Sequence, residues 1–436
     1  MRAVPRALKK ACTSQSVTKM RPMMCHIDEA NGALTPAQVY SGQSGPSSHT
    51  STKYMDQSVT FRFKLETFTT SSASVNRRYL PEGDHIRAFA ALLVLFYHGL
   101  HLFGAQLHGR IFNASQDWIY SPNPVLDILA EGHFGVGLFI VLSGFILSLG
   151  AVGNRIAYKP FLTARILRIC PMLVACLLVA TNVRPTTLAN FLTTLLSVNV
   201  SAGTANSFVA MFWAVAVEFQ CYLIFPLLIA FSNERGTRFL IQVILVAFVL
   251  RVLACLAEDA NPRDLSYWTI VGRIDQFCIG MIAARLYASR GLAKLSAAWF
   301  VPTAIMTAVV LWQFNRLGGW PVIRSWKIAW PTIEGCIAAC FILTYMAAGR
   351  LLPYRISWLG AKLGEISYSI YLVHPVVISA IISGGFYVRP TGNEYNDALA
   401  TTLIVALPAV VGIAFLTYHT IELPFLRMRP KYILRP

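Results

Sequence analysis

The chain has 436 residues, of which 55% are hydrophobic and only 13% are charged. Soluble domains carry about 25% charged residues, so a chain with so few charges cannot cover a large globular surface with water-compatible groups. The composition therefore excludes an ordinary soluble fold and indicates that lipid solvates much of the surface. The net charge of +17 does not indicate nucleic-acid binding, because the basic residues lie in short segments between apolar runs and form no stripe.

The N-terminal segment differs in composition from the rest of the chain. Residues 1–80 are rich in Ser, Thr and basic residues and contain no apolar run long enough to span a membrane. We predict a polar, disordered extension here; the alternative is a targeting or regulatory segment, since its Arg- and Ser-rich character resembles a transit peptide. Residues 81–429 are then the membrane domain, and residues 430–436 are a cytoplasmic tail.

Apolar runs recur regularly from residue 86 onwards. A transmembrane helix needs about 20 predominantly apolar residues, and this spacing predicts an all-α polytopic membrane protein with about ten transmembrane helices around a central cavity. A shorter run, Leu188–Val200, predicts an extra helix in the membrane interface. The predicted spans lie near residues 86–104, 134–152, 169–183, 209–231, 239–257, 268–288, 297–314, 328–348, 366–386 and 398–418.

The loops indicate the orientation. Lys and Arg concentrate in the even-numbered loops and the C-terminal tail, whereas Asp and Glu are more frequent on the opposite side. The positive-inside rule then places both termini in the cytoplasm and favours an even number of spans. The loop near residues 315–327 is an exception, because it is basic on the predicted outer side.

Cysteines give no sign of a metal site. Seven of the nine lie inside apolar runs, and none has CxxC-type ligand spacing. Buried Cys usually acts as a small hydrophobic residue, so we interpret even Cys336 and Cys340, one helical turn apart, as packing residues. No bound metal or cofactor is expected.

Ionisable residues inside spans are the best indicators of function, because each costs about 2.5–3.5 kcal/mol on insertion scales. Arg87 and His98 occupy the first span, 11 residues apart. At 100° per residue they share one face, roughly 16 Å apart along the axis. This spacing suits a ligand with an anionic head and a reactive group deeper in the membrane. The alternative is a topology anchor and a core histidine.

Two arginines open the third span. Arg165 and Arg168 form an RxxR element that ends at Pro171, and one helical turn places both guanidiniums on one side. Such a pair is a good clamp for phosphate. The alternative is that both are ordinary topology determinants.

Further polar residues lie within later spans. Glu218 could serve as a base or orient a histidine; alternatively it forms a structural ion pair with Arg251 or Arg273. Asp275 could simply be paired with Arg273, and Glu334 lies in the eighth span. Ser143 is either a pocket residue or a packing serine. His374 precedes Pro375, which we expect to kink its helix so that it lines a cavity.

In sequence order these segments resemble the membrane-bound acyltransferase 3 family, which acylates bacterial cell-surface and secreted glycans. The resemblance covers residues 80 to 429. DHIRAFAALLVLFYH resembles the opening motif of the family, GHFGVGLFIVLSGFILS its second-helix signature and RILRICP its RxxR element. FWAVAVEFQCYLIFPLL, LGEISYSIYLVHPVV and IELPF are similar to its later motifs.

The resemblance implies a multi-pass O-acyltransferase of the bacterial inner membrane. It implies that an acyl group, most simply acetyl, passes from cytoplasmic acyl-CoA to a carbohydrate or lipid-linked glycan. His98 and Glu218 are then the expected catalytic residues, with Arg87, Arg165 and Arg168 as the acyl-donor site. Further expected pocket residues are Asp84, Ser143, Asp275 and His374. The alternative function is a proton-coupled transporter, since buried Glu, Asp and His could relay protons.

Overall fold

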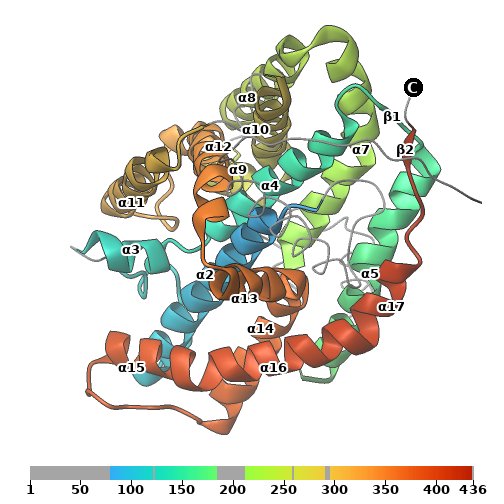
Figure 1. Cartoon of the computed structure of the whole chain (residues 1–436). Helices are drawn as coiled ribbons and strands as arrows, with labels where there is room; N and C mark the ends of the chain where they lie inside the picture. The colour runs from blue at the N-terminus through green and yellow to red at the C-terminus, as the bar shows by residue number, and fades with distance from the viewer. Residues whose placement is uncertain (1–78, 121–122, 184–211, 258–259, 290–294, 435–436) are drawn as a thin grey trace, which may run out of the picture. The chain divides into compact units, whose positions relative to one another are not determined.

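The computed structural model describes residues 79–120, 123–183, 212–257, 260–289 and 295–434 (Figure 1). The predicted N-terminal extension, apart from its last two residues, and the predicted interfacial helix Leu188–Val200 lie outside this part of the chain. Within it, the protein is almost entirely helical, which confirms the predicted all-α class.

Nine helical segments in the described ranges are long and apolar enough to cross a membrane. They match nine of the ten predicted spans in order. Their bounds are α2 (Pro81–Leu107), α4 (Phe134–Ala151), α5 (Tyr158–Val183), α7 (Trp213–Arg235), α8 (Thr237–Ala257), η4 (Ala297–Trp299) with α11 (Phe300–Arg316), α12 (Trp330–Ala348) with η6 (Gly349–Leu351), α14 (Ser367–Gly384), and the segment Glu394–Arg427. That last segment runs through α15 (Glu394–Thr401), η7 (Thr402–Ala406), α16 (Leu407–Thr417), η8 (Tyr418–Glu422) and α17 (Leu423–Arg427).

The tenth predicted span is α10 (Ile270–Ser289), which is less apolar because it carries buried charges. It packs tightly against α4. A Cβ added at Gly144 would lie 2.2 Å from the Phe277 carbonyl oxygen, and one added at Gly280 would lie 2.0 Å from the Val141 carbonyl oxygen. The absence of a side chain at each glycine therefore lets the two backbones approach closely, as small residues commonly do between membrane helices.

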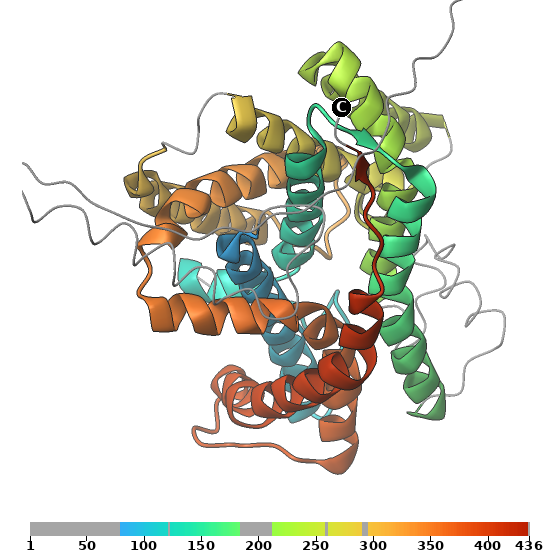
Figure 2. The ribbon, with the colours of Figure 1, turned by 45° about the vertical axis from the view of Figure 1, so that its right-hand side comes forward.

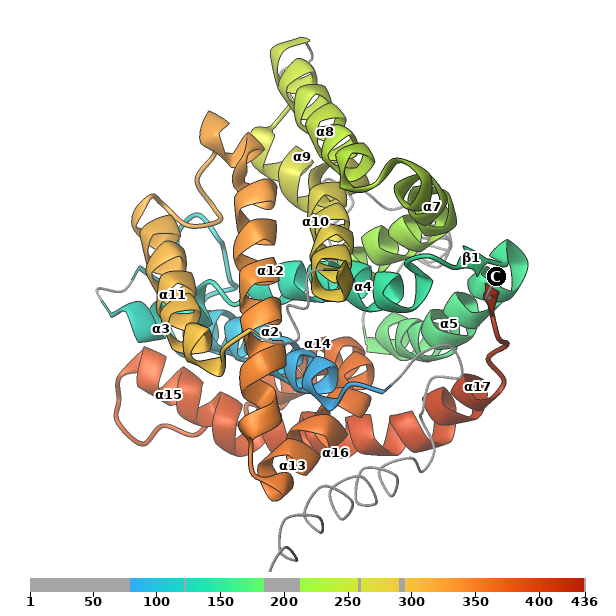
Figure 3. The same cartoon turned by 45° about the horizontal axis from the view of Figure 1, so that its top comes forward.

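Helix α2 lies among α4, α13 (Tyr354–Glu365), α14 and α15 (Figures 1 and 3). The amphipathic helix α13 was not predicted. It is held close to α2, since a Cβ at Gly364 would lie 2.0 Å from the Asp84 carbonyl oxygen. Helix α8 packs mainly on α10 and keeps most of its side chains exposed, as expected for a lipid-facing helix.

Successive spans reverse direction, so the elements gather at two ends. One end holds the start of α2, helix α13 and a two-stranded sheet in which β1 (Arg155–Ile156) pairs antiparallel with β2 (Ile433–Leu434), beside α5 (Figure 2). The other end holds α3 (Pro124–Ala130), α9 (Pro262–Trp268) and η5 (Ser325–Ile328). The start of α2 and the end of α17 lie at the same end, as an even number of spans requires.

Two sequence interpretations need correction. Helix α5 begins at Tyr158, eleven residues before the predicted start at residue 169. Arg165 and Arg168 therefore lie within the helix and not at its N-terminal end. Cys336 and Cys340 are exposed on α12 and do not pack inside the protein, because hydropathy cannot distinguish a lipid-facing cysteine from a buried one.

Candidate functional site

Two cavities open at the end that carries the start of α2. These overlapping cavities, with about 830 and 730 Å³ of space free of protein atoms including open solvent, share Arg87, Ser143, Arg165, Arg168 and Tyr222. We call their union the arginine cavity. The lining further includes Tyr79, Asp84, Glu218, Glu365, Tyr368, Tyr371, Tyr418, Arg429 and Tyr432.

Two of the cavity's guanidiniums are paired with carboxylates. Arg87 donates to Asp84 at 2.5 Å, one turn earlier on α2. Arg168 pairs with Glu422, and Ser369 also donates to the Glu422 carboxylate, at 2.9 Å. Both arginines therefore have fixed positions, although each side chain keeps about a quarter of its surface accessible (24% and 22%).

Arg165 and Arg429 have no carboxylate within salt-bridge distance in the described part of the chain. The Arg165 guanidinium lies 5.6 Å from the ring centre of Tyr222 and 5.8 Å from that of Tyr432. Burial, together with Arg168 and Arg165 nearby, lowers the pKa of Arg429 to about 10. Positive charge is therefore in excess here, and a bound anion would relieve the repulsion.

Glu218 lies deeper in the same cavity. Its carboxylate accepts hydrogen bonds from Ser143 on α4 and from Tyr222, one turn further along α7. Neither Arg251 nor Arg273 is its partner, contrary to the alternative raised from the sequence. Glu218 thus has two hydroxyl donors and lies between the arginines and the interior of the bundle.

His98 lies further along α2, beside a second histidine. Its Nδ1 is 3.1 Å from His374 Nε2 on α14, and the two rings stack at 5.0 Å. His374 Nδ1 is 3.2 Å from the Ile370 carbonyl oxygen, and His98 Nδ1 is 3.1 Å from that of Val94. His374 is fully buried, whereas His98 stays partly accessible.

For neutral imidazoles, these contacts determine which ring nitrogens carry the protons. A carbonyl oxygen only accepts, so His374 carries its proton on Nδ1 and offers Nε2 as an acceptor. His98 then carries its proton on Nδ1, shared between Val94 and His374. The remaining nitrogen, His98 Nε2, has a free lone pair and can act as a base or nucleophile.

Asp275, a predicted pocket residue, does not line either cavity. It is fully buried and forms a two-point pair with Arg251, at 2.9 and 2.7 Å. Arg273 donates instead to Glu334, at 2.7 Å. The suggested Arg273–Asp275 pair is therefore wrong, because the spacing on α10 points the two side chains at different neighbouring helices. No group of acidic, His and Cys side chains suited to a metal occurs in the described residues.

A smaller pocket lies at the opposite end. It comprises about 280 Å³ of space free of protein atoms, open solvent included, and we call it the aromatic pocket. Three of its rings come from separate elements: Tyr267 from α9, Trp320 from the loop after α11, and Trp330 from the start of α12. The rest of the lining is His133, Arg263, Ser266, Arg273, Phe314, Lys327 and Pro331.

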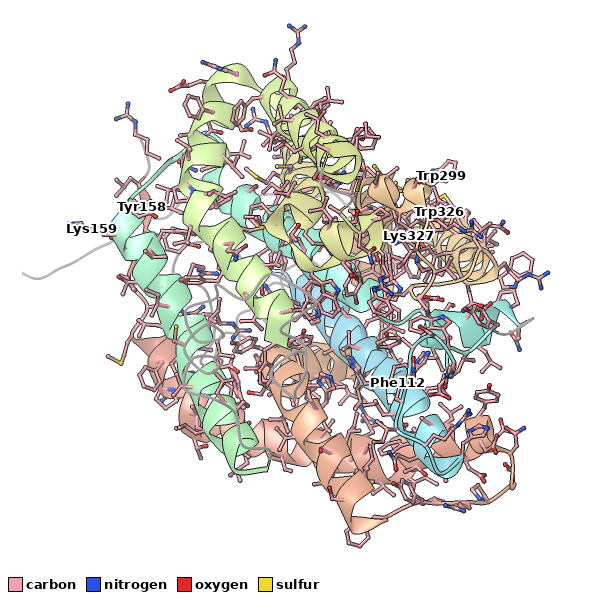
Figure 4. All side chains as sticks on the ribbon, turned by 180° about the vertical axis from the view of Figure 1, so that it is seen from behind. Phe112, Tyr158, Lys159, Trp299, Trp326 and Lys327 are labelled. Carbon is pink, nitrogen blue, oxygen red and sulfur yellow. The ribbon has the colours of Figure 1, made fainter. Side chains whose placement is uncertain are left out.

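Buried ionisable groups surround this pocket. Lys327, labelled beside Trp326 in Figure 4, donates to the carbonyl oxygens of Gly319 and Trp320 at 2.6 and 2.7 Å, and burial lowers its pKa to about 7. Burial also raises the pKa of Glu131 to about 8, although Asn315 donates to it at 2.8 Å. Lys327 is one of the three basic residues in the loop near 315–327 that departs from the positive-inside rule, and its two carbonyl partners account for its place there.

A continuous line of aromatic rings joins the two ends through His98. Tyr371 lines the arginine cavity, and its ring centre lies 5.7 Å from that of His374. On the other side of His98, the Tyr97 ring lies 4.8 Å from His98 and 6.0 Å from His133, which lines the aromatic pocket. Tyr371 and His374 thus lie between His98 and the arginine cavity. Tyr97 lies between His98 and the aromatic pocket.

The structure brings most of the residues predicted from the sequence together. Asp84, Arg87, Ser143, Arg165, Arg168 and Glu218 line the arginine cavity. His98 and His374 lie together next to Tyr371, and Asp275 lies elsewhere. Sequence reasoning missed Arg429, Tyr222 and the whole aromatic pocket. The basic C-terminal segment was a usable signal for Arg429, because it follows directly on a span whose start also carries arginines.

Comparison with known proteins supplies the chemistry. The family model described as an acyltransferase domain, of the acyltransferase 3 family, matches residues 81–419. The chain is 26% identical over 385 residues to "Acyltransferase MdmB" of Streptomyces mycarofaciens, covering 80% of this chain and 92% of the relative. It is 25% identical over 398 residues to "Putative peptidoglycan O-acetyltransferase YrhL" of Bacillus subtilis (strain 168), covering 80% of this chain and 55% of that protein.

A third relative, "Putative acetyltransferase ORF330" of Acidianus two-tailed virus, is 26% identical over 314 residues, covering 69% of this chain and 84% of that protein. No solved structure matches the chain significantly. Helical spans around a deep cavity, combined with the family match, define a multi-pass membrane acyltransferase. The chain belongs to the acyltransferase 3 family, and the resemblance recognised in its motifs is confirmed.

Proposed function

We propose that the protein transfers an acyl group, most simply acetyl, from acyl-CoA to a hydroxyl of a carbohydrate, and that the arginine cavity takes the acyl donor from the cytoplasm. The observation that carries this proposal is the convergence of four guanidiniums, of Arg87, Arg165, Arg168 and Arg429, on one cavity. CoA carries several phosphate groups, and guanidinium groups bind phosphate in fixed two-point geometry. The cavity extends to Tyr371, whose ring centre lies 5.7 Å from that of His374.

In the proposed reaction, His98 Nε2 takes the proton of an acceptor hydroxyl as its oxygen attacks the thioester carbonyl. The carbon–sulfur bond breaks, and the CoA thiolate leaves and takes up the proton that His98 carries. The alternative route places the acyl group on His98 Nε2 first and passes it to the acceptor in a second step. Both routes require the free lone pair that the hydrogen bond to His374 leaves on Nε2.

For Glu218 we propose a different role from the catalytic one expected from the sequence. Its observed partners are Ser143 and Tyr222, whereas the observed side-chain partner of His98 is His374. We therefore propose that Glu218 holds the Tyr222 ring against Arg165 and shapes the donor path. His374 then takes the positioning role that a carboxylate has in a catalytic triad.

The class of acceptor is proposed from the family. One relative bears the name of a putative peptidoglycan O-acetyltransferase, and this supports a carbohydrate or lipid-linked glycan reached from the outer face of the bacterial inner membrane. With both termini in the cytoplasm, as the distribution of basic loop residues indicates, the arginine cavity faces the cytoplasm and the aromatic pocket faces outwards.

The test is His98→Ala, expressed in a strain that lacks the wild-type protein. We expect acyl transfer to fall by about 10²–10⁴-fold, the usual contribution of a general base, while membrane abundance is unchanged. His419→Ala, at an exposed position on η8, is the matched control and should keep full activity. Mass spectrometry of surface glycans measures the acetyl groups. Full acetylation by the His98 variant would remove this residue from the mechanism.

A further inference from the structure

The aromatic pocket has features that packing alone leaves unexplained. The indole N–H groups of Trp320 and Trp330 are inaccessible to solvent and have no acceptor in the described structure. His133 Nδ1 is buried in the same way, and it lies 3.8 Å from an equally unpartnered oxygen of Glu334, too far for a direct hydrogen bond. Buried polar groups are normally hydrogen-bonded, so these four donors and acceptors point to a polar ligand.

The cations around the pocket are already engaged. Arg273 pairs with Glu334 at 2.7 Å, and Arg263 pairs with Asp264 at 2.8 Å. Lys327 donates to two backbone carbonyl oxygens. An anionic ligand would therefore find no unpaired cation here. The guest that fits is uncharged and carries hydroxyl groups.

Aromatic side chains make up much of the pocket's lining. The centres of Tyr267 and Trp320 lie 5.6 Å apart at an angle of 62°, and Phe314 stacks on Trp330 at 4.1 Å. Guanidiniums back two of these rings, with Arg263 at 4.6 Å from Trp320 and Arg273 at 4.5 Å from Tyr267. Rigid rings with a polar edge suit a ligand that is apolar on one face and polar around its rim.

The local backbone holds Trp320 in place. Gly318 and Gly319 take φ values of +105° and +57°, which few other residues adopt. A Cβ at Gly319 would also lie 2.4 Å from Trp118 Nε1. Lys327 then fixes the turn through the carbonyl oxygens of Gly319 and Trp320. The pocket is thus preformed, as specific small-ligand sites usually are.

From these observations we infer that the aromatic pocket binds a pyranose ring of the acceptor glycan. A sugar ring has apolar C–H faces for Tyr267 and Trp320 and hydroxyl oxygens for the indole N–H groups. Tyr97, in contact with both His133 and His98, would lie between the bound ring and the reacting centre. This inference rests on the proposed function and names its acceptor site.

The first experiment replaces Trp326 by p-benzoylphenylalanine in cells that make the native acceptor. Trp326 packs against Phe314 and Trp330 at 5.6 and 5.9 Å without lining the pocket, so the pocket stays intact. Irradiation should yield a carbohydrate adduct, seen as hexose or hexosamine mass increments on the tryptic peptide. Trp299, 60% exposed at the start of α11 and labelled in Figure 4, is the matched control and should yield none. Lipid or protein adducts alone, or no adduct, would overturn the inference.

The second experiment measures transfer of radiolabelled acetyl from acetyl-CoA to endogenous glycan in membrane vesicles. Trp320→Ala should lower transfer by about tenfold, as loss of a central aromatic contact does, while acetyl-CoA binding is unchanged. Trp320→Phe keeps a ring and should fall between this variant and the wild type. Trp299→Ala should match the wild type.

The two readouts separate the two hypotheses. If wild-type vesicles neither bind acetyl-CoA nor label glycan, the proposed function fails. If they do both and Trp320→Ala transfers at the wild-type rate, the function stands and the acceptor site is refuted. If Trp320→Ala does not fold, Trp320→Phe and the crosslink decide the matter.

Discussion

The two ends of the protein differ in how the cations of their cavities are paired. The arginine cavity contains two guanidiniums, of Arg165 and Arg429, that have no carboxylate partner among the residues the structure describes. The aromatic pocket is small, and its cations are bound to neighbouring carboxylates or carbonyl oxygens. The difference teaches that net basic charge is a poor guide to an anion site in such a chain. What matters is whether the nearest acidic group has already neutralised each cation.

The strongest test of this comparison changes the residue that joins the two ends. His374→Phe removes the acceptor for His98 Nδ1–H but keeps a ring of similar size. We expect kcat to fall by about 100-fold, the lower range for a misaligned general base, with little change in KM for acyl-CoA. His374→Gln offers an amide oxygen to the same proton and should recover part of the rate and restore the wild-type pH profile. Equal activity of the two variants would contradict a positioning role.

Donor binding should depend on the unpaired arginines. Arg165→Gln should raise the dissociation constant for acetyl-CoA by about 10–100-fold, because a hydrogen bond to a charged group contributes about 1.5–3 kcal/mol. Isothermal titration with purified protein measures this change. Arg235, exposed at the end of α7, provides the matched control Arg235→Gln. If both variants bound acetyl-CoA equally, the arginine cavity would not be the donor site.

The aromatic pocket should be sensitive to backbone strain. Gly319→Ala places a methyl group 2.4 Å from Trp118 Nε1 and 2.6 Å from Glu131 Oε1, at a φ of +57°. We expect a loss of about 1–3 kcal/mol in unfolding free energy, seen as a lower Tm in a scanning fluorescence experiment. Acetyl-CoA binding at the other end should be retained. A Tm equal to that of Gly412→Ala, at an open position on α16, would show that the turn can relax.

The smallest expected effect is a pH dependence. Burial raises the pKa of Glu131 from 4.5 to about 8, against hydrogen bonds from Asn315 and Trp118. The folded state therefore binds more protons than the unfolded state between these values, and this contribution to stability is lost as pH rises from about 4.5 to 8. The Glu131→Gln variant has no titrating group at this position. The difference between its Tm and that of the wild type should therefore shift in favour of the variant by a few degrees as the pH is raised from 5 to 8. A constant difference would mean that Glu131 stays ionised throughout.

The fold was largely predictable because hydropathy controls it. Long apolar runs predicted the order of the spans, and even α10, with its buried Arg273 and Asp275, lies in a predicted span. Helix α13 was missed, because an amphipathic helix of 12 residues has no apolar run of spanning length. The start of α5 was misplaced because Arg165 and Arg168 look like loop residues until Tyr222 and Glu422 are seen beside them.

The site was only partly predictable. Arg87, Arg165 and Arg168 could be grouped because they belong to known motifs at the same end. The contact of His98 with His374, 276 residues away, depends on how α2 packs against α14. The aromatic pocket combines rings from three short elements with no common spacing. A lysine on the side where basic residues are rare, next to several Trp residues, was its one signal in the sequence.

The glycine contacts between α4 and α10 restrict how such an enzyme can move. A backbone carbonyl oxygen of each helix lies against a glycine of the other, in the place that a Cβ atom would occupy. Sliding or tilting of one helix against the other would therefore bring the carbonyl oxygens into collision with neighbouring side chains. The pair must therefore behave as a fixed pivot during turnover. Any rearrangement during turnover then has to move other helices relative to this pair, whereas α8, which packs mainly on α10 and pairs Arg251 with Asp275, should stay with it.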